Sequence, residues 1–224
     1  SDHIIDGMDA YETAIKEAVE KAKQGYIVTF GIVPTKPETG YGYIERKGDD
    51  VISFREKPNQ VSARDYIAKG NFLWNSGMFC FKAGVLLDEL KAFVPEVYAK
   101  SKLVWDANTN GNLDLNLSLD IPSISIDYAV MERSKKIKVV SASFSWSDLG
   151  SFESVYDYLV SIGHPVDENG NMVIGTDTYT AFIGVKDTIF VYTPTANLIL
   201  KKECSQDVKS LYSKLEIKNS PLLD

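Results

Sequence analysis

A carboxylate and an ammonium group stand side by side where a strand is expected to end. In Phe54-Arg-Glu-Lys-Pro58, the proline stops a strand and leaves Glu56 and Lys57 at its terminus. Ligands of α/β sheets gather at such ends. A carboxylate there can accept hydrogen bonds from two sugar hydroxyls, and an ammonium can neutralise a phosphate. A solvated surface pair is the commoner role of these two residue types, so both interpretations stay open.

Two further segments place glycine within an expected strand or an amide side chain at the entry to one. Gly42 lies in Gly40-Tyr-Gly-Tyr43, where glycine indicates either a simple hairpin distortion or the close approach of another group to the backbone. Asn75 lies in Trp74-Asn-Ser-Gly77 and offers both a donor and an acceptor, which suits a hydroxyl group. Asn and Gly also occur together for turn geometry alone.

A third carboxylate, Asp148, lies at the junction of an expected strand and an expected helix, in Trp146-Ser-Asp-Leu-Gly-Ser151. It could cap the helix or hold a divalent cation, and the sequence leaves both roles open. The sequence has no Walker-type phosphate loop, no Gly-x-Ser-x-Gly elbow and no Cys/His nucleophile pair. Covalent catalysis is therefore not indicated.

Alternating strands and helices must position these polar segments. Short apolar runs predict strands, and apolar residues at helical spacing predict helices. The expected strands are 26–33, 41–47, 51–57, 77–82 and 137–144, and the expected helices are 9–24, 62–69, 83–93, 95–105, 126–133 and 151–162. This alternation favours a layered α/β fold with a mostly parallel sheet. Within it, we assign Ile126–Met131 to packing.

The pattern changes after Gly163. Residues 164–170 form a polar, turn-rich segment, and 171–201 contain short β-branched runs without a helical period. An amphipathic segment follows at about 205–216. We therefore expect a small β-rich region over 164–224.

Composition and charge exclude several classes of protein. The 224 residues are 44% hydrophobic and 25% charged, as in an ordinary globular protein. The net charge of −7 argues against nucleic-acid binding, and neither a membrane span nor a secretory signal is visible. Two cysteines, Cys80 and Cys204, fit a reducing compartment, so we expect a cytoplasmic protein. With His3 and His164 as its only histidines, a His-rich zinc site is not expected.

Taken together and in order, the segments resemble mannose-1-phosphate guanylyltransferases, within the nucleoside-diphosphate-sugar pyrophosphorylases. The matching segments are Gly31–Ile44, Phe54–Pro58, Trp74–Phe79, Ser125–Glu132 and Trp146–Ser151. The resemblance covers residues 1–162 and, more loosely, the rest. It implies an α/β, Rossmann-like nucleotidyltransferase fold of the glycosyltransferase-A type, with a mixed sheet flanked by helices. The implied domains are a nucleotidyltransferase domain at 1–163 and the β-rich region at 164–224.

The resemblance also implies an activity. The family forms GDP-mannose and pyrophosphate from GTP and mannose 1-phosphate, with Mg²⁺ as cofactor. The alternatives are another sugar-1-phosphate nucleotidyltransferase, using UTP or dTTP with glucose 1-phosphate, and a non-catalytic sugar-nucleotide-binding subunit. The expected partners are GTP and mannose 1-phosphate, without nucleic acid or membrane, and a homo-oligomer is compatible with the family.

Site roles follow from the resemblance position by position. Asp2 and Asp148 match the two metal-binding aspartates, so Asp148 and Lys57 are the expected catalytic residues. Lys57 would meet the sugar phosphate and Glu56 the sugar hydroxyls. Two further residues would complete substrate binding, with Gly42 letting the backbone approach the sugar and Asn75 forming a hydrogen bond to it.

One family feature has no counterpart in this sequence. The family opens with a strand and a glycine-rich loop, G-G-x-G-T-R-L-x-P, that cradles the triphosphate and the base, whereas this chain starts at the later Ser-Asp-His motif. The chain is then either part of a longer protein, which we favour, or a degenerate homologue. We expect the 224-residue chain alone to be inactive. The assignment of guanine as the base that the enzyme selects rests on the resemblance alone. The isomerase domain fused to some relatives is also not seen.

Overall fold

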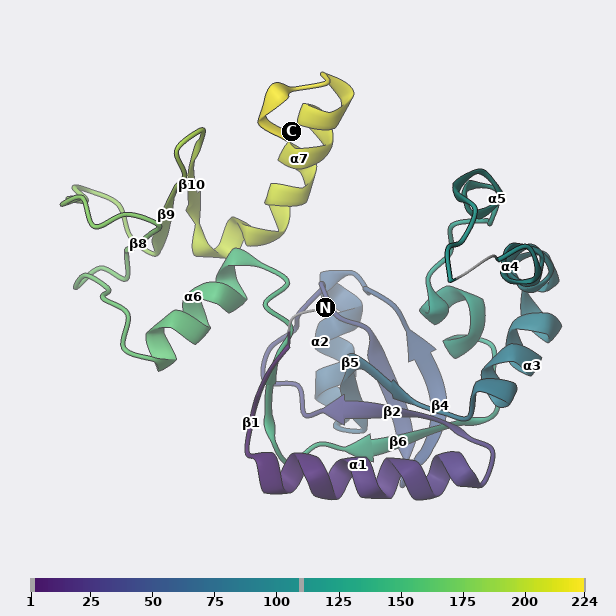
Figure 1. Ribbon diagram of the computed structural model, residues 1–224. Coiled ribbons are helices and arrows are strands. Elements are labelled where there is room, and N and C mark those ends of the chain that lie inside the picture. Colours follow the sequence, from purple (N-terminus) through teal and green to yellow (C-terminus); the bar gives the residue numbers. More distant parts are fainter. Residues whose placement is uncertain (1–2, 109–110, 224) are drawn as a thin grey trace. The chain divides into compact units, whose positions relative to one another are not determined.

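The computed structural model describes residues 3–108 and 111–223, which pack into two compact units (Figure 1). The larger unit runs from Ile5 to Trp146, and the second comprises the described residues from Ser147 onward with those before Ile5. The short strands β1 (Ile4–Asp6) and β7 (Ser145–Ser147) form a two-stranded sheet. The domain boundary expected after residue 163 stays a prediction.

Five strands of the larger unit form one closed sheet in the order β2-β5-β3-β4-β6. They are β2 (Ile27–Ile32), β5 (Phe72–Cys80), β3 (Tyr43–Lys47), β4 (Asp50–Arg55) and β6 (Ile137–Ser141). β2 and β6 are parallel, and the other pairs in this sheet are antiparallel. The mixed sheet is confirmed, whereas the expected mostly parallel sheet is wrong. A two-residue turn joins β3 to β4, and strands joined in this way must run in opposite directions.

Helices cover the two faces of the sheet (Figure 1). The helical elements of this unit are α1 (Met8–Lys23), α2 (Gln60–Lys69), α3 (Ala83–Phe93), α4 (Pro95–Asp106), α5 (Leu115–Leu119) and the π-helical turn η1 (Asp127–Met131). Alternate residues of β2 point to opposite faces. Ile27 therefore packs with Val130 of η1, while Val28 packs with Ala18 of α1. This two-sided burial is what the uninterrupted apolar run of β2 predicts.

The strand expected at 77–82 begins earlier, at Phe72, and so includes the Asn75-Ser-Gly77 segment. Trp74 stands opposite Tyr43 of β3, and both residues are almost fully buried. Aromatic residues stabilise such cross-strand pairs. Asn75 is consequently held inside the sheet rather than in a loop before it.

The second unit contains a three-stranded sheet after residue 163, which confirms the small β-rich region expected there. Its elements are α6 (Phe152–Ser161), β8 (Met172–Ile174), β9 (Thr188–Tyr192), β10 (Asn197–Lys201), η2 (Lys202–Asp207), α7 (Val208–Ile217) and η3 (Pro221–Leu223). β8 pairs with β9 in parallel and β10 with β9 in antiparallel orientation. Tyr156 of α6 packs with Met172, Ile189 and Leu200 from the three strands, which closes a separate apolar core.

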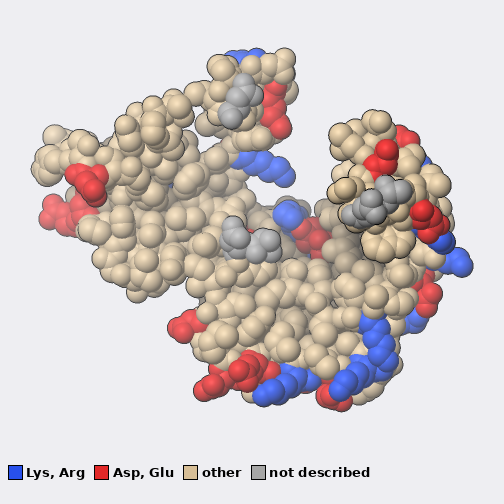
Figure 2. Space-filling view, viewed as in Figure 1, with Lys and Arg blue, Asp and Glu red and all other residues tan. Residues whose placement is uncertain are grey.

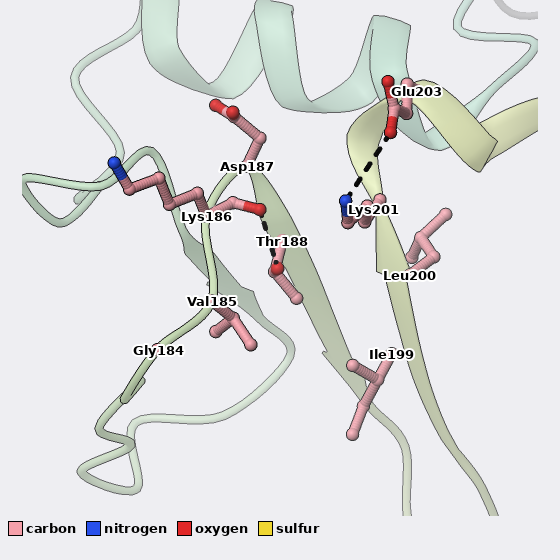
Figure 3. Close-up of a pocket in the computed structure, with 9 residues that line it drawn as sticks. All are labelled: Gly184, Val185, Lys186, Asp187, Thr188, Ile199, Leu200, Lys201 and Glu203. Carbon is pink, nitrogen blue, oxygen red and sulfur yellow. Dashed lines mark hydrogen bonds and ion pairs between the residues drawn. The ribbon is translucent and has the colours of Figure 1, made fainter.

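A groove of about 580 Å³ follows this small sheet, lined by residues 184–188, 199–201 and Glu203 (Figure 3). Its polar contacts are a Lys201–Glu203 ion pair of 3.7 Å and a hydrogen bond of 3.1 Å from the Thr188 hydroxyl to the Lys186 carbonyl. The lining contains none of the predicted site residues that the structure describes. We assign no chemistry to it.

Acidic and basic side chains are mixed along the outer side of α1. Three ion pairs join residues one helical turn apart: Lys16 with Glu12, Lys21 with Glu17 and Lys23 with Glu20. Figure 2 shows both signs interspersed over this part of the surface. A face that binds a phosphate backbone is instead predominantly basic.

In the part of the chain that the structure describes, no helix has the length and apolar character that crossing a bilayer requires.

Candidate active site

Glu56 and Lys57 follow directly after β4, as expected, and contact each other. The Lys57 ammonium donates a hydrogen bond to the Glu56 carboxylate. The Glu56 side chain is only 7% exposed, whereas that of Lys57 is 58% exposed. The pair is therefore not a simple solvated one, because its carboxylate is enclosed by protein and its ammonium reaches solvent.

The backbone of Lys57 is in the left-handed region, with φ of 43°. Few residues other than glycine adopt this conformation, and such strained positions cluster at functional sites. Pro58 follows immediately and disfavours the ordinary helical conformation of the residue before it. The chain therefore turns sharply at Lys57 and leaves the end of β4 with both charged side chains at the same place.

Gly42 lies against Glu56. A Cβ atom at residue 42 would stand 2.6 Å from Glu56 Oε2 and 3.3 Å from Asn75 Cβ, so any side chain there would displace the carboxylate. The Gly42 carbonyl accepts a hydrogen bond of 2.8 Å from the Asn75 backbone N–H. Of the two roles considered for this glycine, close approach of another group is the one that the structure shows.

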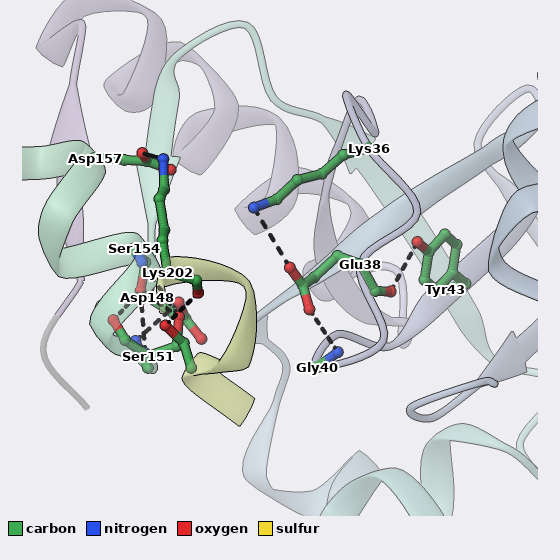
Figure 4. A network of polar contacts seen from close by, with 11 residues as sticks. Lys36, Glu38, Gly40, Tyr43, Asp148, Ser151, Ser154, Asp157 and Lys202 are labelled. Carbon is green, nitrogen blue, oxygen red and sulfur yellow. Dashed lines mark hydrogen bonds and ion pairs between the residues drawn. The ribbon is translucent and has the colours of Figure 1, made fainter. Parts of the chain in front are cut away.

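The loop that carries Gly42 is fixed by one acidic residue, Glu38 (Figure 4). Its carboxylate accepts a hydrogen bond of 2.9 Å from the Gly40 N–H and lies 3.6 Å from the Lys36 ammonium. Its backbone carbonyl accepts a hydrogen bond of 2.9 Å from the buried Tyr43 hydroxyl. The loop is thus joined to β3, and Gly42 has a defined position beside Glu56.

Asn75 sits at an irregularity between β2 and β5. Thr29 pairs with Phe79 and Gly31 with Asn75, so β5 has two more residues than β2 over the same span. Gly77 lies within this bulge at φ of 74°, a conformation that glycine adopts without steric cost. The bulge brings the Asn75 amide to the Thr29 hydroxyl, whose Oγ1 lies 2.7 Å from Asn75 Oδ1.

Asp127 also belongs to this group, which the sequence analysis did not anticipate. Its Oδ1 lies 3.4 Å from Asn75 Nδ2. The assignment of Ile126–Met131 to packing is correct for Ala129, Val130 and Met131, which are buried in the core, but it is wrong for Asp127. No local pattern singled out Asp127, because one aspartate in a helical segment is commonly a surface residue.

The charges in this group influence one another. Burial raises the pKa of Asp127, and the negative charge of Glu56 raises it further, while the Lys57 ammonium opposes both effects. Burial also lowers the pKa of Lys57, but the hydrogen bond and charge of Glu56, together with the charge of Asp127, outweigh this and hold it above its usual value. We call Gly42, Glu56, Lys57, Asn75 and Asp127 the Glu56 cluster.

Asp148 lies in the second unit, in a tight turn before α6. Its Oδ1 accepts a hydrogen bond of 3.0 Å from the Gly150 N–H, and Leu149 between them has a left-handed φ of 47°. The cap of α6 is formed by Ser151 and Ser154, whose hydroxyls and backbone N–H groups bond reciprocally (Figure 4). The prediction that Asp148 could cap α6 is therefore wrong, because Ser151 and Ser154 already form the cap.

Asp148 fits a magnesium ligand in kind. Magnesium prefers oxygen ligands and commonly takes only one or two carboxylates from a protein. Over residues 3–108 and 111–223, no group of three or more His, Cys, Asp or Glu side chains is placed to hold a metal ion. The other expected ligand, Asp2, lies outside the described residues. A shared site of Asp2 and Asp148 stays a prediction.

Residues 1–163 match the family model described as nucleotidyl transferase. The chain belongs to the nucleotidyl transferase family. Residues 165–215 match a second model, the mannose-phosphate isomerase/GMP-like β-helix domain, which agrees with the three-stranded sheet of the second unit. The predicted fold class is thereby confirmed.

Named relatives confirm the resemblance to mannose-1-phosphate guanylyltransferases. The enzyme of that name from Klebsiella pneumoniae is 37% identical over 236 residues, covering 93% of this chain and 49% of the relative. Mannose-1-phosphate guanylyltransferase RfbM from Salmonella typhimurium is 39% identical over 236 residues, covering 96% of this chain and 49% of the relative. The chain spans about half the length of these curated relatives.

Among the solved structures that are similar to this chain are two with related descriptions. One, described as mannose-1-phosphate geranyltransferase from Thermus thermophilus, is 27% identical with a TM-score of 0.78, and the match covers 96% of this chain and 68% of that one. The other, described as mannose-6-phosphate isomerase from Helicobacter pylori, is 41% identical with a TM-score of 0.63. The match covers 66% of this chain and 62% of that one.

Proposed function

We propose that this chain contributes the sugar-phosphate site of an enzyme that forms GDP-mannose and pyrophosphate from GTP and mannose 1-phosphate. The observation that carries the proposal is the Glu56 cluster, in which an enclosed carboxylate, an exposed ammonium and a buried amide come together from separate segments of the chain. The choice of GTP and mannose 1-phosphate as substrates follows from the names of the relatives. The cluster supplies groups of the kind that such a substrate needs.

The sugar would be recognised by the enclosed groups. Glu56 and Asp127 are acceptors when ionised, and the Asn75 amide adds hydrogen-bond donors. A buried carboxylate that bonds two neighbouring hydroxyls discriminates strongly against a sugar that lacks one of them, because its unpaired oxygen would remain desolvated. Gly42 keeps this space open, since a side chain at that position would reach into it.

The phosphate would be met by Lys57. Its ammonium carries a full positive charge at neutral pH, because its pKa lies above the usual lysine value. The side chain is 58% exposed and can turn from Glu56 to an arriving phosphate. It would then reduce the repulsion between two polyanionic substrates and hold the attacking phosphate oxygen in line with the α-phosphorus of GTP.

Magnesium, when bound, would supply positive charge that stabilises the negative charge developing as pyrophosphate leaves. Asp148, with the predicted partner Asp2, would hold it. The turn at Leu149 and the Gly150 N–H fix the Asp148 carboxylate in one position. A side chain at residue 150 would overlap that carboxylate, so Gly150 preserves its placement.

The proposal is tested by assaying the complete encoded protein with GTP and mannose 1-phosphate in the presence of Mg²⁺, and by separating the nucleotide products. Formation of GDP-mannose with an equal amount of pyrophosphate is the expected result. Turnover only with UTP or dTTP and glucose 1-phosphate would replace it by the first alternative. Calorimetric binding of GDP-mannose without turnover would favour a non-catalytic subunit.

We also propose that the protein works in the cytoplasm. Cys80 and Cys204 are both free thiols in the structure, which agrees with a reducing compartment. A homo-oligomer remains a prediction that light scattering of the complete protein would test.

A further inference from the structure

The amide of Asn75 has only one orientation that satisfies its surroundings. The Gly77 backbone N–H lies 3.3 Å from Asn75 Oδ1. A backbone N–H can only donate a hydrogen bond, so the amide atom that faces it must be the oxygen. This contact distinguishes the two ends of the side chain without reference to any ligand.

The Thr29 hydroxyl reinforces that orientation. Its Oγ1 lies 2.7 Å from the same oxygen, and both side chains are buried, with Thr29 fully enclosed. Because the atom is an oxygen without hydrogen, the hydroxyl must donate. The Met78 carbonyl is a second and longer contact of this hydroxyl, at 3.4 Å. Thr29 therefore forms its short hydrogen bond with Asn75.

The nitrogen end of the amide then faces Asp127. Asn75 Nδ2 lies 3.4 Å from Asp127 Oδ1, a long hydrogen bond in which the amide donates. Rotation of the amide by 180° would place its oxygen beside a carboxylate and its NH2 group against the Gly77 N–H. Both new contacts would be repulsive, and the Thr29 bond would have to reverse. The same amide orientation is therefore favoured by all three contacts, those with Thr29, Gly77 and Asp127.

We infer that Thr29 is a positioning residue for the sugar site: its hydroxyl holds the Asn75 amide so that the NH2 group, and not the oxygen, faces Asp127 and the substrate. The site then presents a donor beside the carboxylates of Glu56 and Asp127. A sugar hydroxyl can donate to one of these carboxylates while it accepts from the amide. This inference rests on the proposed function for its substrate, but not for the amide orientation itself.

The test replaces Thr29 by valine, which has the same shape without the donor, and by serine, which keeps the donor. In the complete protein, we expect Thr29→Val to raise the KM for mannose 1-phosphate about tenfold, as fits the loss of one buried hydrogen bond. The KM for GTP should stay the same, and kcat should change far less than the KM for the sugar phosphate. Thr29→Ser should restore the parental value. Thr13→Val, which removes an exposed hydroxyl on α1, is the matched control.

Side-chain NMR signals of 15N-labelled asparagine provide a readout that needs no substrate. The Asn75 NH2 resonances, identified by their loss in Asn75→Asp, should move in Thr29→Val and return in Thr29→Ser. Unchanged resonances would overturn the inference, as would an unchanged KM for mannose 1-phosphate in a protein that makes GDP-mannose. If the parent makes no GDP-mannose, the proposed function fails while the NMR result still decides the orientation. Should Thr29→Val not fold, Thr29→Ala compared with Thr29→Ser gives the same contrast.

Discussion

The Glu56 carboxylate occupies the space that a side chain at Gly42 would need. Its Oε2 lies 2.6 Å from the position of a Cβ atom at residue 42. Residue 42 is in a loop and Glu56 follows a different strand, so the two positions constrain each other only in the folded protein.

Gly42→Ala should therefore weaken sugar-phosphate binding. The added methyl group must push Glu56 away, and we expect the KM for mannose 1-phosphate to rise about 10- to 100-fold, corresponding to one or two lost hydrogen bonds to a charged group. Steady-state kinetics of the complete protein measure this. Gly84→Ala is the matched control, because its Cβ would meet open space and it lies in a helix, where alanine is favourable. Equal kinetics for the two variants would contradict the role of Gly42.

Asp127→Asn should stabilise the fold above the pKa of Asp127 while it weakens activity. The pKa of this carboxyl is raised in the folded protein by burial and by Glu56. Between its usual value of about 4 and the raised value, the folded state binds more protons than the unfolded state, so stability falls as the pH rises. Asparagine cannot ionise, so the variant does not lose this stability as the pH rises. Urea unfolding at several pH values should show a variant that is more stable than the parent at pH 7, with the gain shrinking as the pH falls towards 4. A pH-independent difference would contradict this assignment.

Asp148→Asn should abolish GDP-mannose formation without unfolding the protein. The amide keeps an acceptor for the Gly150 N–H, but it lacks the charge that a hard cation requires. We expect a loss in kcat of at least about 100-fold, the magnitude typical of removing one electrostatic contact to a transition state. Thermal unfolding should stay the same.

Ser151→Ala separates this role from helix capping. It removes the cap of α6 and should cost about 1 kcal/mol of stability. If Asp148→Asn lowered stability by as much and left turnover intact, the residue would be structural.

Lys57→Met should lower kcat/KM for mannose 1-phosphate by about 100-fold or more, because the phosphate loses its counter-charge. The unfolding free energy should fall as well, by about 1–3 kcal/mol, because the enclosed Glu56 carboxylate loses the ammonium that compensates its charge. Chemical denaturation and kinetics on the same preparation distinguish the two effects. A large loss of stability with unchanged kcat/KM would show that the Glu56–Lys57 pair serves the fold instead.

Local irregularities in the sequence singled out Gly42, Glu56, Lys57 and Asn75, and the family resemblance supplied the roles expected of them. A proline after Glu56 and Lys57, a glycine at position 42 of an expected strand and an amide at position 75 just before another each break a pattern that packing alone would keep. Breaks of this kind are visible without knowing which strands are neighbours. The α/β class and most of the helices followed from periodicity for the same reason.

Asp127 and Thr29 could not be identified in this way. Threonine is an ordinary strand residue, and a single aspartate in a helical segment is an ordinary surface residue. Their roles depend on the pairing of β2 with β5 and on the position of η1, which are set by contacts between distant segments. The antiparallel pairing of β5 with β2 and β3 was missed because the order of helices and strands does not fix strand direction.

The geometry of the proposed sugar site depends on the number of residues in the bulge of β5. The two additional residues between Asn75 and Phe79 let the strand resume its pairing with β2 at Thr29 after Asn75 has turned toward Asp127. Loss of one of them would shift every following side chain of β5 to the opposite face. Among homologues, this short stretch should therefore accept other apolar residues at Met78 yet never gain or lose a codon.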